Sequence, residues 1–198
     1  RNCLYRGRFN ALIKRLAEND QFKQLISLPE KSSKNMKDVE LVLRFFAYRD
    51  FDESEKYADN LTEHLNGYME NNQGMSESRI AHLEKLFTET VSLIFNTLGP
   101  GVAFRRPLDA QNPQDSRFTS AMINGAIFES QMISVSRLVE SGNPQPNDLR
   151  NRIVSVFSNQ EYMGSVLSST AKRAKVIKRT RLLDDAIAVQ GVADGIAR

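Results

Sequence analysis

The chain has 198 residues, of which 40% are hydrophobic and 26% are charged. This composition is typical of an ordinary soluble globular protein, and the length suits one domain with a substantial core. The formal net charge of +3 and the pI of about 9.0 favour anionic partners only mildly, and they do not establish nucleic-acid binding. Cys3 is the single cysteine, which excludes an internal disulfide and predicts a cytoplasmic location.

No apolar run reaches the roughly 18 to 20 residues that a membrane-spanning helix needs, so we predict no membrane partner. The first residues also lack the charged-then-apolar pattern of a signal peptide. Because the chain opens at Arg1 rather than at methionine, we expect it to be a fragment of something longer.

In the first part of the chain, apolar residues recur at helical spacing. They predict one amphipathic helix over residues 9–26 that ends before Pro29. The next predicted segments are a polar linker over residues 30–35, a helix from about Met36 to Tyr48, a charged connection over residues 50–56 and a helix from Tyr57 to Met69.

The clearest helical pattern runs from Ile80 to Leu98, and Gly99-Pro100-Gly101 stops it. Residues 109–116 predict a loop. The remaining predicted segments are a helix from Met122 to Leu138 that ends near residues 141–144, a short helix from Pro146 to Phe157, and a last helix capped by Ser168-Ser169-Thr170.

Sustained alternation of apolar and polar residues, which would indicate strands, is missing from the sequence. The predicted fold is therefore all-α: an irregular bundle of about six to eight helices in a single domain over residues 1–198.

Within the helix predicted from Met36 to Tyr48, apolar residues surround Glu40 and Arg44, which stand one helical turn apart. This pattern predicts a buried helix with one ion pair, because charges in such a place must pair or contact a ligand. The pair could fix how the helix docks on its neighbours, or it could present Arg44 to a phosphate or to a nucleotide-binding module. Buried polar groups more often specify packing, which favours the structural role.

Two further groups of basic residues are candidates for contacts with nucleic acid. Arg105 and Arg106 follow a Gly-Pro-Gly turn and could contact a phosphate, or they could be solvated on a surface loop that Phe104 anchors. The second group fills six of the ten positions from Lys172 to Arg181 and comprises Lys172, Arg173, Lys175, Lys178, Arg179 and Arg181.

The second group also fits a simpler interpretation. On a helical wheel its basic residues spread widely, while Val176, Thr180, Leu183 and Ile187 occupy one face. This is the pattern of a solvated amphipathic helix whose long side chains need no ligand. Both interpretations stay open for this segment.

Catalytic chemistry has little support in the sequence. His64 and His82 are the only histidines, and neither has cysteine or carboxylate neighbours at metal-ligand spacing, so we predict no metal site. The chain has no phosphate-binding Gly-rich motif and no nucleophile elbow. We therefore predict no cofactor, no catalytic residue and no catalysis by this chain alone.

Several segments together resemble a known family: Arg8-Phe9-Asn10, the run from Glu40 to Phe46, the Tyr57–Met69 helix with Leu65, Gly99, and Phe104-Arg105. From about Arg6 to Arg181 the chain is similar to the helical C-terminal part of ParB-like restriction proteins, as in GmrSD-type and DNA-phosphorothioation defence systems. In that family, the resemblance implies, an N-terminal domain with an Asp-Gly-Gln-Gln-Arg motif hydrolyses nucleotide, and a His-Asn-His region may cut DNA. Neither motif is present in this sequence.

The resemblance implies a non-catalytic module whose partner is a missing ParB-like N-terminal domain or a partner subunit. The first two predicted helices, with Arg8, Asn10, Glu40 and Arg44, would brace that domain. Arg105, Arg106 and the segment from Lys172 to Arg181 would face DNA or the nuclease. Two alternatives stay open: a stand-alone helical scaffold for protein–protein interaction, and an enzyme whose pocket the sequence cannot show.

Overall fold

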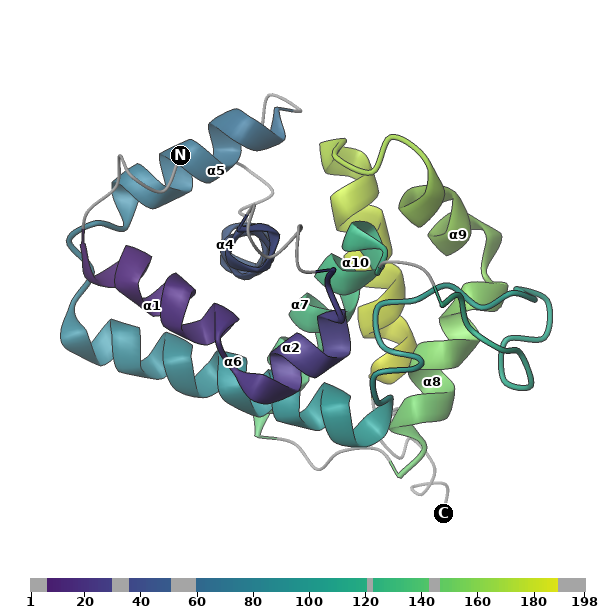
Figure 1. Ribbon diagram of the computed structural model, residues 1–198. Helices are drawn as coiled ribbons and strands as arrows, with labels where there is room; N and C mark the ends of the chain where they lie inside the picture. Colours follow the sequence, from purple (N-terminus) through teal and green to yellow (C-terminus); the bar gives the residue numbers. More distant parts are fainter. Residues whose placement is uncertain (1–6, 30–35, 51–59, 121–122, 143–146, 189–198) are drawn as a thin grey trace, which may run out of the picture.

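A computed structural model describes residues 7–29, 36–50, 60–120, 123–142 and 147–188 (Figure 1). The prediction of an all-α fold is confirmed, although the nine α-helices of these ranges exceed the predicted six to eight. The helices are α1 (Arg8–Ala17), α2 (Asp20–Ile26), α4 (Lys37–Arg49), α5 (Leu61–Asn71), α6 (Glu77–Thr97), α7 (Gly125–Ser141), α8 (Leu149–Ser155), α9 (Gln160–Leu167) and α10 (Arg173–Ile187), with a short 3₁₀ helix, η1 (Val156–Ser158).

Some predictions fall outside the described ranges. They concern the linker over residues 30–35, nearly all of the charged connection over residues 50–56, the start of the third helix at Tyr57, and Cys3.

The single helix predicted over residues 9–26 is wrong, because the chain forms α1 and α2 there. Helix α1 ends at Ala17, and the Asn19 side chain accepts a hydrogen bond of 2.9 Å from the Phe22 backbone N–H. A side-chain oxygen in this position satisfies a donor that the first turn of a helix leaves without a partner. Asn19 therefore starts α2 in a new direction, and the apolar faces of both helices stay buried.

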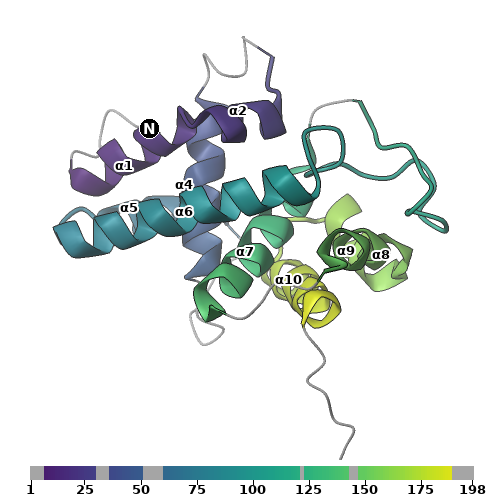
Figure 2. The ribbon, with the colours of Figure 1, turned by 90° about the horizontal axis from the view of Figure 1, so that it is seen from below.

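Helix α4 is the centre of the N-terminal half of the fold. It is seen end-on in Figure 1, and in Figure 2 it stands steeply across α1 and α6. It packs on α1, α5 and α7. Phe45 and Phe46 are completely buried within it, as the apolar sequence predicts, but the Glu40 side chain is 49% exposed.

The long helix predicted from Ile80 to Leu98 is confirmed as α6, which the Ser76 hydroxyl caps. Gly99 follows it with φ of 71°, a left-handed conformation that glycine adopts without strain. The loop predicted over residues 109–116 is also confirmed, and it belongs to a longer non-helical segment that contains one isolated β-bridge between Pro107 and Phe118.

The C-terminal half is built on α7, which contacts α4, α6, α9 and α10. The predicted short helix is observed as α8 and η1, whereas α9 was not predicted. The Asn159 side chain caps α9 by accepting from two backbone N–H groups. The predicted cap of the last helix is wrong, because α10 begins after Lys172 and has no side-chain cap.

One continuous apolar core contains buried residues from both halves of the fold. Its centre includes ring contacts of Phe9 with Phe46 and of Phe22 with Phe87 and Phe128. None of the described helices combines the length and the apolar character that crossing a membrane requires.

Candidate functional site

A buried carboxylate lies in the middle of α7. Glu129 has no exposed surface, and its neighbours from Ala126 to Ser136 are also buried. A carboxylate removed from water needs ionic or hydrogen-bonding partners to stay charged. Glu129 is not among the site residues predicted from the sequence. It is nevertheless the single charged residue between Gly125 and Ser136, and a charge in an apolar stretch is the same signal that singles out Glu40 and Arg44.

Two arginines from distant parts of the sequence meet this carboxylate. Arg44 Nη2, from α4, pairs with Glu129 Oε1, and Arg179 Nη2, from α10, pairs with Oε2. Arg179 is completely buried, and its Nη1 also donates to the Thr170 carbonyl at 2.7 Å. We call Arg44, Glu129 and Arg179 the Glu129 cluster. It joins the N-terminal half of the fold to the last helix through α7.

The predicted pair of Glu40 and Arg44 is only a secondary contact. Glu40 Oε1 lies 3.9 Å from Arg44 Nη1, beyond hydrogen-bond distance, and the Glu40 side chain is half exposed. The expectation of one ion pair inside a buried helix is therefore corrected: Arg44 finds its buried partner on α7, because the opposite face of α4 is taken up by the apolar core.

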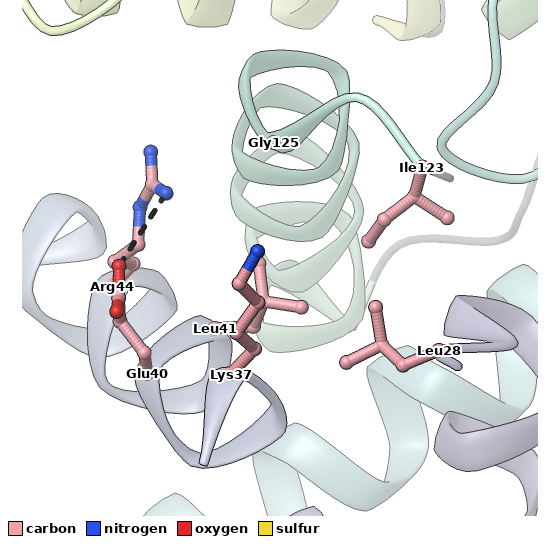
Figure 3. A pocket seen from close by; sticks show the side chains of 7 residues that line it. All are labelled: Leu28, Lys37, Glu40, Leu41, Arg44, Ile123 and Gly125. Atoms are coloured by element: carbon pink, nitrogen blue, oxygen red, sulfur yellow. Dashed lines mark ion pairs between the residues drawn. The ribbon is translucent and has the colours of Figure 1, made fainter. Parts of the chain in front are cut away.

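Beside this cluster is a pocket of about 190 Å³ (Figure 3). Its lining residues come from the segment after α2, from α4, and from the segment that leads into the first residue of α7. They are Leu28, Lys37, Glu40, Leu41, Arg44, Ile123 and Gly125. A Cβ atom at Gly125 would lie 3.4 Å from Arg44 Nη1, so the glycine lets the guanidinium lie close against the first turn of α7.

At the other end of α4, a second set of charges lies at the surface. Arg49 bonds to Asp50 at 2.9 Å and pairs with Glu140 of α7, and Glu140 also faces His82 at 3.3 Å. The Tyr68 hydroxyl donates to Asp50 at 2.7 Å. Burial and the Asp50 carboxylate raise the pKa of Tyr68 well above its ordinary value.

The two arginines after the Gly-Pro-Gly turn lie in different environments. Arg105 is buried, and its Nη1 donates to the carbonyls of Leu25 at 3.0 Å and Ala103 at 2.8 Å. Burial lowers the pKa of Arg105. The prediction that it faces a nucleic acid is corrected for this reason, whereas Arg106 is exposed. Phe104 anchors the segment by packing on Phe128.

The basic segment of α10 does not form one exposed surface. Arg179 points into the core, so its prediction as a nucleic-acid contact is also corrected. Lys175 Nζ donates to the Gly164 carbonyl at 3.0 Å, and Lys178 pairs with Glu161 at 3.2 Å. Arg173 is half-buried, and Lys172 and Arg181 are exposed. The predicted inner face is confirmed, since Val176, Thr180, Leu183 and Ile187 are all buried.

Arg181 borders a second, smaller hollow of about 160 Å³ between α4, α7 and α10. Tyr48 and Asp184 also line it, together with Arg137, which pairs with Asp184.

The two histidines lie on different helices, His64 on α5 and His82 on α6. His64 Nε2 lies 3.1 Å from the Ala47 carbonyl and its ring stacks on Tyr48, while His82 faces Glu140. Among the described residues, no three histidine, cysteine or acidic side chains are grouped closely enough to hold a metal ion.

Comparisons of this chain with protein-family models, with curated proteins and with solved structures give no match. The similarity to ParB-like restriction proteins is therefore a prediction from the residues quoted above.

Proposed function

We propose that this chain is a non-catalytic helical module of a DNA restriction or phage-defence protein, and that it supports a ParB-like nucleotide-hydrolysing domain. The observation that carries the proposal is the Glu129 cluster. Arg44 belongs to the α4 segment on which the family resemblance depends most. The cluster links this segment through Glu129 of α7 to Arg179 of α10. A module tied together in this way presents a rigid surface to a partner domain.

The residues that would brace the partner differ in how well they could reach it. Arg8 is exposed and pairs with Glu77 at 3.1 Å, and Glu40 is half exposed beside the pocket. Arg44 reaches the surface only through the pocket, since 18% of its side chain is exposed. Any partner contact on α4 would therefore involve Lys37 and Glu40 first.

The first test is to read the coding frame upstream of Arg1 and the adjacent genes. We expect an Asp-Gly-Gln-Gln-Arg motif in that frame or in a neighbouring one. A genome without the motif in either place would contradict the proposal and would favour a stand-alone scaffold for protein–protein interaction.

The second test uses the domain that carries the motif. Purified with and without this chain, it should co-elute with the chain on size exclusion and hydrolyse nucleotide faster in its presence. Glu40→Lys should weaken both effects, because it reverses an exposed charge at the proposed contact without touching the core. The control is Lys85→Glu, which reverses an exposed charge on α6. Co-elution that fails for the unmodified chain would refute the proposed support.

Contact with DNA is a second candidate function. The residues available for it are Arg106, Lys172 and Arg181, which are exposed, and Lys178, which also pairs with Glu161. Phosphate contacts by these residues would make binding fall steeply with salt. In a fluorescence anisotropy titration, we expect Lys172→Glu with Arg181→Glu to weaken binding and to lower the salt slope. Binding that changes neither with salt nor with these charge reversals would exclude the contact.

The proposed location of the module is the cytoplasm.

A further inference from the structure

The Glu129 cluster contains more positive than negative charge. Two guanidinium groups share one buried carboxylate, so its three members sum to one positive charge, and only the half-exposed Glu40, 3.9 Å from Arg44 Nη1, offsets that charge. Excess charge inside a protein is unfavourable unless another group compensates it. Arg179 is sealed in the core, whereas Arg44 lines the pocket at the start of α7. The pocket is therefore the place where an anion can reach the excess charge.

A second cation stands at the same pocket. Lys37 lies two helical turns before Arg44 on α4. Figure 3 shows both side chains rising from α4 on the side that faces α7. The remaining wall is apolar and consists of Leu28, Leu41 and Ile123. An anion held here would thus meet two positive groups from α4 next to apolar side chains.

Glu40 is the acidic side chain that lines this pocket, and it is loosely held. Its carboxylate lies 3.9 Å from Arg44 Nη1, and about half of its side chain is exposed. An exposed ion pair of this kind contributes little free energy. A bound anion can therefore displace Glu40 towards water without disturbing the ion pair between Arg44 and Glu129.

We propose that this pocket binds a phosphoryl group, which Arg44 Nη1 and the Lys37 ammonium contact when Glu40 turns away. A guanidinium and an ammonium group together suit the several oxygens of a phosphoryl group. The pocket volume of about 190 Å³ is smaller than the roughly 300 to 1,000 Å³ of sites that enclose a whole ligand. The phosphoryl group enters, and the rest of the ligand stays outside. This site needs no partner domain, so it stands independently of the proposed function.

Calorimetric titration of the full chain tests the site, with sodium pyrophosphate, ATP and sodium acetate as separate probes at low ionic strength. We expect pyrophosphate to bind, Lys37→Ala to weaken it about fivefold, and Glu40→Gln to tighten it about threefold, in line with the worth of single exposed charges. If ATP binds more tightly than pyrophosphate, the phosphoryl group belongs to a nucleotide. If the two bind equally, the ligand is a free phosphate.

Matched controls separate the pocket from general surface charge. Lys85 on α6 is exposed beside Glu89, so Lys85→Ala and Glu89→Gln make the same charge changes elsewhere. Both should leave pyrophosphate binding unchanged. Because all four variants alter exposed side chains, they should stay folded. The proposal is overturned if pyrophosphate does not bind, if Lys85→Ala weakens it as much as Lys37→Ala, or if acetate binds as tightly.

Discussion

Two arginines on α4 pair with two glutamates on α7, and the pairs differ in the burial of the glutamate, since both arginine side chains are largely buried. Arg44 pairs with Glu129, which has no exposed surface, while Arg49 pairs with Glu140, whose side chain is 43% exposed. Water can solvate Glu140 if its contact with Arg49 breaks. It cannot reach Glu129, so that carboxylate depends entirely on protein partners.

We expect the burial of the glutamate, rather than the residue types in the pair, to set how much each ion pair contributes to stability. The deep pair, completed by Arg179, links α4, α7 and α10. The shallow pair belongs to a surface network with Asp50 and His82, each of which has solvent access. Exposed pairs contribute about 0 to 1 kcal/mol, whereas breaking a buried pair costs about 3 to 5 kcal/mol.

The largest predicted effect tests this difference directly. Glu129→Gln should lower the free energy of unfolding by about 3 to 5 kcal/mol, because the buried Arg179 and the largely buried Arg44 lose their counter-charge. Glu140→Gln is the matched control on the same helix and should cost less than about 1 kcal/mol. Urea unfolding measures both, and equal losses would show that depth does not separate the two pairs.

A smaller effect should appear at alkaline pH. Tyr162 is completely buried, its hydroxyl lies 2.8 Å from the Ser130 hydroxyl, and burial raises its pKa to about 12. In the unfolded chain the phenol loses its proton near pH 10, so the fold favours the protonated form. Its contribution is complete below about pH 10 and is lost as the pH rises towards 12.

Between about pH 9 and pH 11, the free energy of unfolding should therefore fall by about 1 kcal/mol through this group. Tyr162→Phe removes the ionisable hydroxyl, so the variant should lose less stability over the same interval. Urea unfolding at the two pH values gives the comparison. An identical loss in the variant would assign the alkaline sensitivity to other groups.

The smallest effects are expected on the outer face of α10. Lys178→Ala and Arg181→Ala should each change the free energy of unfolding by less than about 0.5 kcal/mol, because both side chains are exposed. Arg179→Ala, one residue away, should destabilise the chain by several times more, since it empties one side of the Glu129 cluster. Thermal unfolding of the three variants measures these changes. A large loss of stability in Lys178→Ala or Arg181→Ala would contradict the prediction.

The sequence predicts those features that depend on local patterns. Regular apolar spacing and a following glycine were enough to locate α6, and the apolar composition around Glu40 and Arg44 located α4. The break between α1 and α2 is not predicted, because the helical spacing of apolar residues continues across it, although the Asn19 between them is a frequent N-cap residue. Helix α9 was missed because its eight residues bury only three side chains.

The site could be predicted only in part, because its pairing is tertiary. Spacing along α4 suggested Glu40 as the partner of Arg44, but the choice of Glu129 depends on how α7 packs against α4. Similarly, Arg179 follows the exposed Lys178 in a run of basic residues, and only the packing of α10 on α7 sets it apart. A lone charge in an apolar stretch was the one local signal for Glu129.

The order of the cluster along the chain has a consequence for how the protein is made. The ribosome synthesises Arg44 first, then Glu129 and then Arg179. Until α10 emerges, Glu129 Oε2 on α7 lacks Arg179, its ion-pair partner. The nascent chain therefore cannot form the complete Glu129 cluster while the first helices are being synthesised. The native core forms only after α10 has been translated.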